Sequence, residues 1–375
     1  MGSHGQKHPF KVMIVGCGLG GLSCAIACKR GGLDVQILEK AAKILPVGAG
    51  IQIPPNGTKV LQHYGLEDAL NEGGAVRVGG IHLRRYSDGK LLASNDGSFV
   101  RRMGGAYYVI HRADYHRVLM AEAQRLGVVV STDAEVVKVS FEGRPVVTLH
   151  DGRNLPADVI VGADGLWSTM REQLLGRPCP PEETGDLAYR GTFSLAQLES
   201  LNDPGIMELV ETMSPQVYMG PNRHCVFYPL KNKTEFNLVL LRPDNLPAGA
   251  RTAAGELSEM RETFDGWDST LQALVSCMSS CLKWKLMHMT ELETWVRGSV
   301  VLLGDSCHPS LPYQAQGAAM AVEDGAVLGT LLTRLHDSEL PGPDREHLSA
   351  ILKLYETLRK SRTTLQVQGA IKNRE

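Results

Sequence analysis

The residues with the clearest chemical meaning are three glycines followed by an acid. Gly16, Gly18 and Gly21 form G-x-G-x-x-G directly after the apolar residues 12–15, which suit a buried parallel strand. The first glycine permits a tight turn, the second lets the backbone approach a pyrophosphate, and the third lets helix and strand pack closely. Glu39 ends a second apolar run, where a carboxylate can bind both hydroxyls of an adenosine ribose. The pattern predicts a dinucleotide site, since a glycine-rich turn in another kind of α/β domain leaves the acid unexplained.

Two later segments each place an aspartate at the end of an apolar run. Asp164 lies in Gly-Ala-Asp-Gly after residues 159–161, and Asp305 lies in Gly-Asp-Ser-Cys-His-Pro. Open α/β sheets bind ligands at the carboxyl ends of their strands, so both aspartates are candidate ligand-binding residues. The alternative for Asp305 is a plain helix cap. A helix expected to open near Gly317 and Ala318 offers free backbone N–H groups to an anion.

The chain segments that must position these groups alternate between two kinds of secondary-structure pattern. Strand-loop-helix units rich in small residues occur at the start, around residues 105–175 and near residues 295–335. Strand-rich segments lie between them, at residues 80–100, with a hairpin turn at Asp88-Gly89, and at residues 188–241. We therefore expect an α/β fold with a discontinuous Rossmann-like dinucleotide-binding domain, an inserted antiparallel-sheet substrate domain and a C-terminal helix.

The expected domain boundaries follow from this interleaving. The dinucleotide-binding domain comprises residues 1–78, 105–182 and 285–340, the substrate domain residues 79–104 and 183–284, and the C-terminal helix residues 341–375. Within the substrate domain, residues 255–285 have a helical pattern. The first ten residues predict a disordered lead-in, and the stretch LPGPDRE near residue 340 predicts a loop.

Composition places the chain among ordinary globular proteins. It has 375 residues, of which 43% are hydrophobic and 21% charged, and a formal net charge of −2. This charge gives no reason to expect a nucleic-acid partner. No apolar run reaches the roughly 18 residues of a membrane span, and no secretory signal is present, so we expect a cytoplasmic protein.

The eight cysteines are expected to be structural thiols. Cys24 with Cys28, and Cys277 with Cys281, are spaced so that each pair could contact one metal ion. Neither pair has companion ligands at a zinc-finger spacing, so we expect no metal site. Unpaired thiols are typical of a reducing compartment.

Taken together, the three motifs resemble those of a known family. GCGLGG with Glu39, GADG with Arg171, and GDSCHP with QGAAMAVEDG occur in the order and spacing of the class A flavoprotein monooxygenases, the aromatic-ring hydroxylases. The chain is similar in particular to salicylate hydroxylase-like enzymes and their fungal biosynthetic relatives, from about Lys11 to about Arg362. The resemblance implies tightly bound FAD, NAD(P)H and O2 as co-substrates, and a small aromatic, phenolic or indolic substrate. It also implies a monomer or homodimer.

The resemblance also carries cofactor roles onto this sequence. The glycine triplet would hold the FAD pyrophosphate, Arg112 the phosphate and ribityl region, and Asp305 the ribityl chain. Asp164 belongs to the motif that is linked to both FAD and NAD(P)H. The candidate cofactor-binding residues are Gly16, Gly18, Gly21, Glu39, Lys40, Gly50, Arg112, Val136, Asp164, Asp305, Gly317 and Ala318.

The implied reaction needs substrate-positioning groups. In the family NAD(P)H reduces FAD, O2 adds to give a C4a-hydroperoxide, and one oxygen atom passes to an electron-rich carbon, so that the substrate is hydroxylated or epoxidised. Arg190 in AYRG resembles an arginine that some fungal relatives use to hold a phenolate, although a surface or domain-linking arginine is the alternative. Tyr218 is the second candidate catalytic residue, because it could donate to a substrate oxygen or relay its proton; the alternative is packing. Tyr228 is a further candidate for the same role as Tyr218.

Two other classes of function stay open from the sequence. A flavin oxidase or dehydrogenase would share the cofactor motifs without transferring oxygen to a substrate. A non-catalytic nucleotide-binding protein would share only the first motif and its fold.

Overall fold

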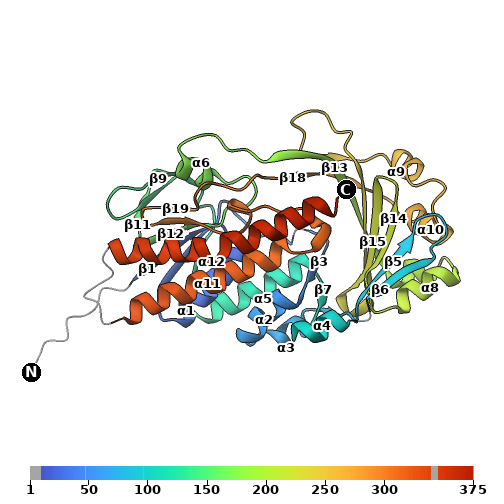
Figure 1. Ribbon diagram of the computed structural model, residues 1–375, viewed down its shortest axis with the longest axis horizontal. Coiled ribbons are helices and arrows are strands. Elements are labelled where there is room, and N and C mark those ends of the chain that lie inside the picture. The colour runs from blue at the N-terminus through green and yellow to red at the C-terminus, as the bar shows by residue number, and fades with distance from the viewer. Residues whose placement is uncertain (1–9, 47, 96, 339–344, 375) are drawn as a thin grey trace, which may run out of the picture. The chain divides into compact units, whose positions relative to one another are not determined.

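The computed structural model describes residues 10–46, 48–95, 97–338 and 345–374 (Figure 1). The chain divides into two compact units. The first unit takes in residues up to 45 together with 116–182 and 288–374, and the second takes in residues 46–115 and 183–287. Most of the expected lead-in and the expected loop near residue 340 lie outside the described residues.

The first unit is built on a six-stranded sheet whose central strands are parallel. Its order is β19 (Val296–Arg297), β20 (Val300–Leu302), β12 (Val159–Gly162), β1 (Lys11–Val15), β2 (Asp34–Leu38) and β8 (Val129–Ser131). The apolar residues of β1, β12 and β20 are fully buried, as expected for strands covered on both faces. Because β2 and β12 flank β1 on opposite sides, the strand order reverses direction beside β1, where open α/β sheets bind ligands.

Helices cover this sheet. They are α1 (Leu19–Arg30), α6 (Thr169–Leu175), α11 (Gly317–Asp337), α12 (Arg345–Lys372) and the part of α5 (Arg112–Arg125) from residue 116 onward. Glycines let α1 and α11 meet almost backbone to backbone, since a side chain at Gly325 would collide with Ser23 and Cys24. Figure 1 shows α12 lying along α11. A three-stranded sheet, β11 (Asn154–Pro156), β10 (Val146–Leu149) and β9 (Val136–Ser140), completes the unit.

The second unit is built on an eight-stranded sheet. Its order is β17 (Thr252–Ala254), β18 (Leu282–His288), β13 (Glu182–Ser194), β16 (Glu235–Pro243), β15 (Arg223–Leu230), β14 (Gln216–Gly220), β5 (Ile81–Arg85) and β6 (Leu91–Asn95). The pairs from β13 to β14 are antiparallel, and β14 runs parallel to β5. The hairpin expected at Asp88-Gly89 is the β5–β6 hairpin, with Gly89 in the left-handed region at φ +64°.

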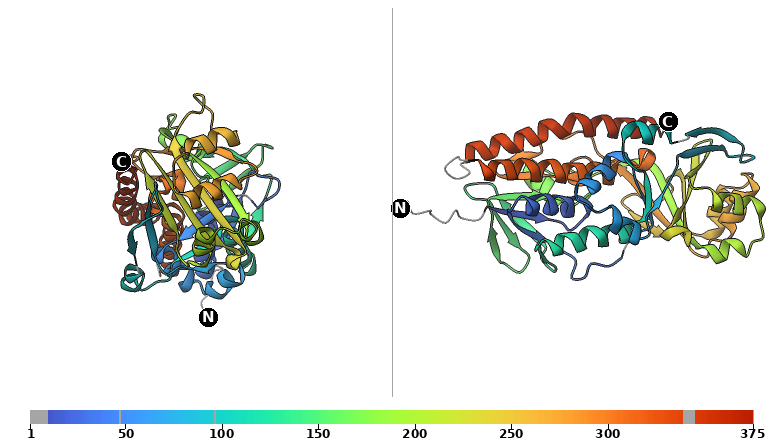
Figure 2. Two further views of the ribbon diagram at one scale, coloured as in Figure 1. Left: turned by 90° about the vertical axis from the view of Figure 1, so that its right-hand side faces the viewer. Right: turned by 90° about the horizontal axis from the view of Figure 1, so that it is seen from below.

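Strand alternation gives this sheet two distinct faces. On the helix face, Tyr189, Phe227 and Leu238 pack in a large core with helical residues. That face is covered by α7 (Leu195–Glu199), α8 (Pro204–Glu211), α9 (Leu257–Thr263) and α10 (Ser269–Ser276). Figure 1 labels α8, α9 and α10, and Figure 2 shows the same elements from two further sides. The opposite face, here called the small-sheet face, carries Arg190, Tyr228 and Asn237. It packs partly against a three-stranded sheet, β3 (Gly50–Ile53), β7 (Tyr108–His111) and β4 (Val76–Arg77).

The two units divide the chain at residues that differ from the domain boundaries expected from the sequence. The three-stranded sheet of β3, β7 and β4 explains this difference. Val76, Val109 and Tyr228 share one apolar core, so residues 46–78 and 105–115 cluster with the second unit. Three further helices belong to the same part of the chain, α2 (Pro55–His63), α3 (Glu67–Glu72) and α4 (Ser98–Met103). The helical pattern of residues 255–285 was wrong at its end, because residues from Leu282 onward form the strand β18. The α/β fold class and the C-terminal helix are confirmed.

Candidate functional site

The glycine loop between β1 and α1 is fixed by the backbone around it. Gly16 has φ +108°, and a side chain there would overlap the carbonyl oxygen of Ala163. A side chain at Gly21 would in turn overlap the carbonyl oxygen of Gly16. The amide N–H of Gly16 donates to the carbonyl of Leu38 at 2.8 Å. Two of the three glycines are therefore required by the close packing of this loop.

Gly18 differs from the other two glycines. A Cβ atom built on Gly18 would meet no protein atom within 4 Å, so open space lies in front of its backbone. Gly18 is also the N-cap of α1, where no side chain caps the free N–H groups. Free N–H groups beside open space at a helix N-terminus form a cradle for an anion, and this cradle fits a pyrophosphate.

Glu39 joins the end of β2 to this loop. Its Oε2 accepts the amide N–H of Cys17 at 3.0 Å, and its Oε1 accepts that of Ala41 at 2.9 Å. A carboxylate has about four acceptor positions, so two remain for ribose hydroxyls. The backbone carbonyl of Glu39 accepts the N–H of Ala134, which brings the segment leading into Val136 to the same place. Lys40 is exposed, and Glu39 beside it is half-buried.

The Asp305 loop follows β20 at the same edge of the sheet. Asp305 is exposed, although its neighbours Gly304 and Ser306 are buried. A Cβ atom built on Gly317, the first residue of α11, would lie 3.0 Å from Oγ of Ser310 and 4.0 Å from Oδ1 of Asp305. The Ser310 hydroxyl is buried with no protein partner. An outward carboxylate, an unpaired hydroxyl and a helix N-terminus together fit a polyhydroxy chain and the polar edge of a flavin.

Two buried charges hold this loop in place. Arg171 donates from Nη1 to the carbonyl of Ser306 at 3.1 Å, and its other nitrogens bind the carbonyls of Cys179 and Leu166. Asp324, on α11, accepts the N–H of Gly304. Burial lowers the pKa of Arg171, but the guanidinium stays charged because its ordinary pKa is so high. The loop conformation is therefore set by charge-assisted hydrogen bonds to its backbone.

The contacts of Asp164 in the structure are local. Its Oδ1 accepts the hydroxyl of Ser168 at 2.5 Å and its Oδ2 accepts the N–H of Met170 at 3.0 Å. Ser168 itself caps α6 through the N–H of Arg171. These bonds show a helix-capping role; the predicted contact of Asp164 with dinucleotides stays a prediction.

In the second unit, the small-sheet face brings together three polar residues from neighbouring strands. Tyr228 and Asn237 lie directly opposite each other on β15 and β16, and Arg190 lies diagonally from Asn237 on β13. Nε of Arg190 and Nδ2 of Asn237 are buried without protein acceptors. Burial raises the pKa of Tyr228 well above its usual value, and the nearby Arg190 charge offsets only part of this. The Tyr228 hydroxyl therefore stays protonated and can donate.

Tyr218 is on the other face of the same sheet. It is 1% exposed and packs in the core under the helices, opposite Cys225. Burial raises its pKa far above the usual value, and Asp268 adds to the effect. The structure does not bring Tyr218 together with Arg190, and the position of Tyr218 favours packing, the alternative that the sequence left open.

Gly50 and Arg112 also belong to the second unit. The ring of Tyr228 lies against Gly50, where a Cβ atom would be 2.5 Å from the ring, so no larger residue fits. The N–H of Gly50 donates to Oδ1 of Asn237 at 3.1 Å. The N–H of Arg112 donates to the carbonyl of Ala49 at 2.9 Å, and its side chain packs beside Gly48. The predicted roles of Gly50 and Arg112 toward FAD stay predictions.

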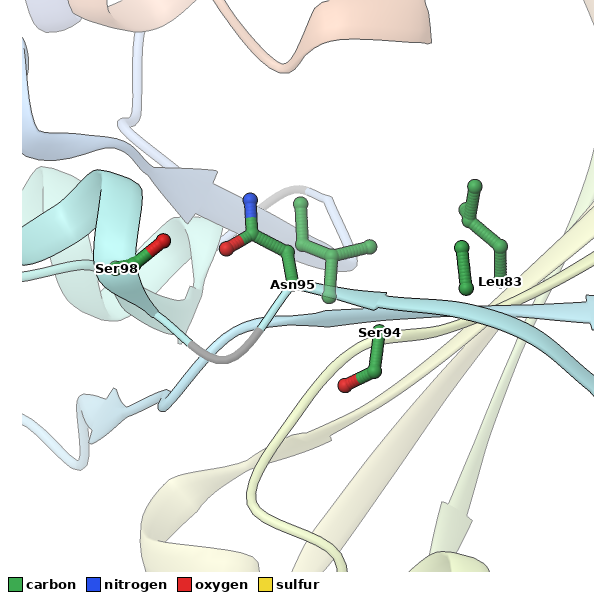
Figure 3. A pocket seen from close by; sticks show the side chains of 6 residues that line it. Leu83, Ser94, Asn95 and Ser98 are labelled. Carbon is green, nitrogen blue, oxygen red and sulfur yellow. The ribbon is translucent and has the colours of Figure 1, made fainter.

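A surface hollow of about 500 Å³ lies at the β5–β6 hairpin (Figure 3). Leu83 and Asn95 point to one side of the hairpin, and Ser94 points to the other. The hollow is open to solvent and contains none of the residues predicted from sequence. The candidate site in this unit is therefore the cluster of Arg190, Asn237 and Tyr228.

Comparisons with known proteins agree with this geometry. A family model described as "FAD binding domain" matches residues 9–362. The FAD-dependent monooxygenase OpS4 of Beauveria bassiana is 38% identical over 98% of this chain and 85% of its own length. The 6-hydroxynicotinate 3-monooxygenase of Pseudomonas fluorescens is 34% identical over 88% of this chain and 85% of its own. A salicylate hydroxylase in complex with its substrate has a similar fold, with a TM-score of 0.83 at 24% identity over 98% of this chain and 88% of its own.

The chain belongs to this family of FAD-binding proteins. Its matched relatives are named as FAD-dependent monooxygenases and aromatic hydroxylases, which confirms the class of enzyme and the cofactor that the resemblance implied. Within the described residues, no helix combines the length and the apolarity that crossing a membrane requires.

Sequence reasoning missed two groups that the structure places at these sites. Asn237 lies inside an apolar strand. The pairing of β16 with β15 places it opposite Tyr228, and a hydrogen bond joins it to Gly50; neither contact can be seen in the sequence. Ser310 was not singled out among the residues after Asp305. The sequence signal for Asn237 was a single amide among apolar residues, which a buried strand rarely carries without a partner.

Proposed function

We propose that this monooxygenase consumes NAD(P)H and O2 to hydroxylate a small aromatic compound that carries a phenolic or carboxylate oxygen. The balanced reaction is substrate–H + O2 + NAD(P)H + H⁺ giving substrate–OH + H2O + NAD(P)⁺. Two relatives support the substrate class by their names, 6-hydroxynicotinate 3-monooxygenase and 3-hydroxybenzoate 6-hydroxylase, since both names describe an aromatic ring with a hydroxyl and a carboxylate.

The residues of the first unit would bind the polar groups of FAD. The open backbone at Gly18 and the N-terminus of α1 would take the pyrophosphate, and Glu39 would bind the ribose of the adenosine. Asp305 and the N–H groups of Gly317 and Ala318 would bind the ribityl chain and the flavin edge. When bound, FAD would pass electrons from NAD(P)H to O2 and so activate one oxygen atom of O2 for transfer, which no amino-acid side chain can do.

The residues of the second unit would orient the substrate. The single observation that carries the proposal is the guanidinium of Arg190, whose Nε is buried without an acceptor next to the protonated hydroxyl of Tyr228. A fixed positive charge beside a neutral donor binds a phenolate or carboxylate oxygen. It also favours the ionised form of a phenol, whose ring is more electron-rich than that of the neutral phenol and so more reactive toward an electrophilic oxygen.

Turnover of the FAD-loaded protein tests this proposal. NADH and NADPH oxidation is measured with a panel of hydroxybenzoates, hydroxynicotinates and larger phenols under ¹⁸O2, and peroxide is measured in parallel. We expect at least one phenol to stimulate oxidation and to gain one ¹⁸O atom. Stimulated oxidation that yields only peroxide with every phenol, or a product without ¹⁸O, would favour the oxidase or dehydrogenase alternative.

Two pairs of variants separate the roles of the units. R190A should keep FAD and lose substrate-stimulated oxidation, whereas R84A, which removes an arginine from the other face of the same sheet, should keep both. D305A should lose FAD during purification, whereas D337A, at the far end of α11, should retain it. Normal turnover in R190A, or an unchanged flavin content in D305A, would contradict the assigned role.

A further inference from the structure

Asn237 has a hydrogen-bonding pattern that the fold alone does not complete. Its Oδ1 accepts the N–H of Gly50 at 3.1 Å, which fixes the orientation of the amide. Its Nδ2 therefore points the other way, and this atom is buried without any protein acceptor. The whole residue is 0% exposed. Buried amide donors are nearly always satisfied in folded proteins, so the free Nδ2 indicates a partner that the chain itself does not supply.

Arg190 shows the same incompleteness on the neighbouring strand. Its Nε is also buried without an acceptor. Thr192 is the residue directly opposite Asn237 on β13, and Arg190 lies two positions before it on the same face. Diagonal neighbours of this kind lie within reach of a long side chain. Two donors that lack acceptors thus belong to diagonal neighbours on the small-sheet face.

The other groups at this place do not supply an acceptor. The Tyr228 hydroxyl remains protonated, and its ring contacts Gly50. Oε1 of Gln52, two residues after Gly50, accepts the hydroxyl of Tyr107. The cluster therefore has two donor atoms without acceptors, Nδ2 of Asn237 and Nε of Arg190, and the guanidinium carries a full positive charge.

We propose that Nδ2 of Asn237 and Nε of Arg190 bind one oxyanion of the aromatic substrate. This inference deepens the proposed function and rests on it. An ionised phenol or a carboxylate is the ligand that these donors recognise, because each of its oxygens accepts several hydrogen bonds and its charge offsets that of the guanidinium. Asn237 is then a substrate-binding residue, and the Gly50 N–H is its positioning group, because it turns Nδ2 toward the ligand.

The test uses the FAD-loaded protein without NAD(P)H, so that binding is measured apart from turnover. The probe is 4-nitrophenol, whose visible absorption band appears only when it is ionised. We expect the wild-type protein to bind it as the phenolate at a pH below the pKa of the free phenol. N237D keeps the acceptor for the Gly50 N–H but replaces the donor with a second oxygen. We expect it to weaken phenolate binding by about 10- to 100-fold at neutral pH.

A pH series separates binding from a structural role. The carboxyl group introduced by N237D becomes a donor again when it is protonated, so the affinity lost in this variant should return as the pH falls. The wild-type protein should show no such recovery. N245D makes the same chemical change at an asparagine that bonds Glu259 on the helix side, and it should leave phenolate affinity unchanged. A double variant, N237D with R190K, should lose less affinity than the sum of the single changes if both residues bind one oxygen.

Each outcome decides the proposal. Binding of 4-nitrophenol in its neutral form, absence of binding, or equal affinity in N237D and the wild type would overturn it. The alternative acceptor for the two donors is a carbonyl oxygen of the flavin. Titration of the apoprotein with FAD tests this alternative. If N237D weakens FAD affinity and leaves phenolate affinity unchanged, the donors serve the cofactor and the inference is wrong. The proposed function can survive that result, because it is tested separately by ¹⁸O incorporation.

Discussion

The backbone N–H of Gly304 donates to Oδ2 of Asp324 across a distance of 3.1 Å. This bond ties the loop that presents Asp305 to a carboxylate that is 0% exposed on α11. Nε2 of His308 lies 2.6 Å from the same oxygen, and Nε of Arg359 lies 2.6 Å from the other. Burial alone would raise the pKa of Asp324, but His308 and Arg359 outweigh it and lower the pKa below its ordinary value.

Removing this charge should loosen the cofactor loop. D324N leaves the Arg359 guanidinium buried with one carboxylate fewer, and it weakens the acceptor for Gly304. We expect a loss of about 2–4 kcal/mol in the free energy of unfolding, measured with denaturant, together with weaker FAD binding. E323Q removes the second, partly exposed partner of Arg359 and serves as the control. Full FAD affinity in a folded D324N protein would show that the loop keeps its shape without this bond.

The glycines of the first loop should respond differently to alanine. G16A forces a side chain into a residue with φ +108° and against the carbonyl of Ala163, so it should destabilise the protein by about 1–3 kcal/mol or prevent folding. G18A places its methyl group in open space, so the stability of the apoprotein should be nearly unchanged while FAD affinity falls. Thermal unfolding and flavin fluorescence titration measure the two effects. Unaltered FAD affinity in G18A would contradict the pyrophosphate cradle.

The two tyrosines of the large sheet provide a matched pair. Y228F removes a hydroxyl from the small-sheet face beside Arg190, whereas Y218F removes one from the helix-side core. We expect Y228F to lower kcat or raise KM about 10-fold, as expected for one lost hydrogen bond to a charged group. Y218F should change stability by about 1 kcal/mol and leave turnover near normal. The reverse pattern would support the catalytic role predicted for Tyr218 from the sequence.

One histidine should make stability depend on pH. Burial lowers the pKa of His224 to about 4 from its ordinary 6.5, and Asp186 offsets part of this. The folded state therefore holds His224 neutral while the unfolded state takes up a proton. Its contribution is complete above about pH 6.5 and is lost as the pH falls toward 4, by about 2–4 kcal/mol in total.

Replacing this histidine checks the assignment. In H224L the free energy of unfolding should fall less steeply between about pH 6.5 and pH 4 than in the wild type. H150Q, at an exposed histidine, should keep the wild-type slope. Parallel curves for H224L and the wild type would mean that other groups cause the acid sensitivity.

The candidate cofactor-binding residues of the first unit could be located from the sequence because their signals are local. Gly16 and Gly21 are required by the turn that directly joins β1 to α1, and Glu39 ends the next strand. Asp305 follows a buried strand and is exposed, as its place at the carboxyl end of that strand suggested. Each of these residues lies at or just after the end of a strand that periodicity and turn chemistry predict, although contacts from distant residues such as Ala163 and Arg171 hold them in place.

The substrate half could not be predicted in the same way. Alternation shows that Gln216 and Tyr218 share a face, but which face meets helices depends on how α8, α9 and α10 pack, and α9 and α10 are far away in sequence. The role of Asn237 depends on Gly50, which is 187 positions away in the chain. Residues 46–78 also cluster with the second unit, in which Val76 and Tyr228 share one apolar core. These contacts are set by tertiary packing, which local patterns do not contain.

The close contact between α1 and α11 has a consequence for synthesis of the chain. Ser23 donates to the carbonyl of Val322, and a side chain at Gly329 would collide with Ala27 and Cys28. The glycine loop emerges from the ribosome long before its supporting helix α11, because β2 to α10 lie between them in the chain. The nascent first unit must therefore wait, with one side of α1 uncovered, until α11 is released. Flavin capture is then a late event, and chains that stop before α11 should leave the ribosome without cofactor.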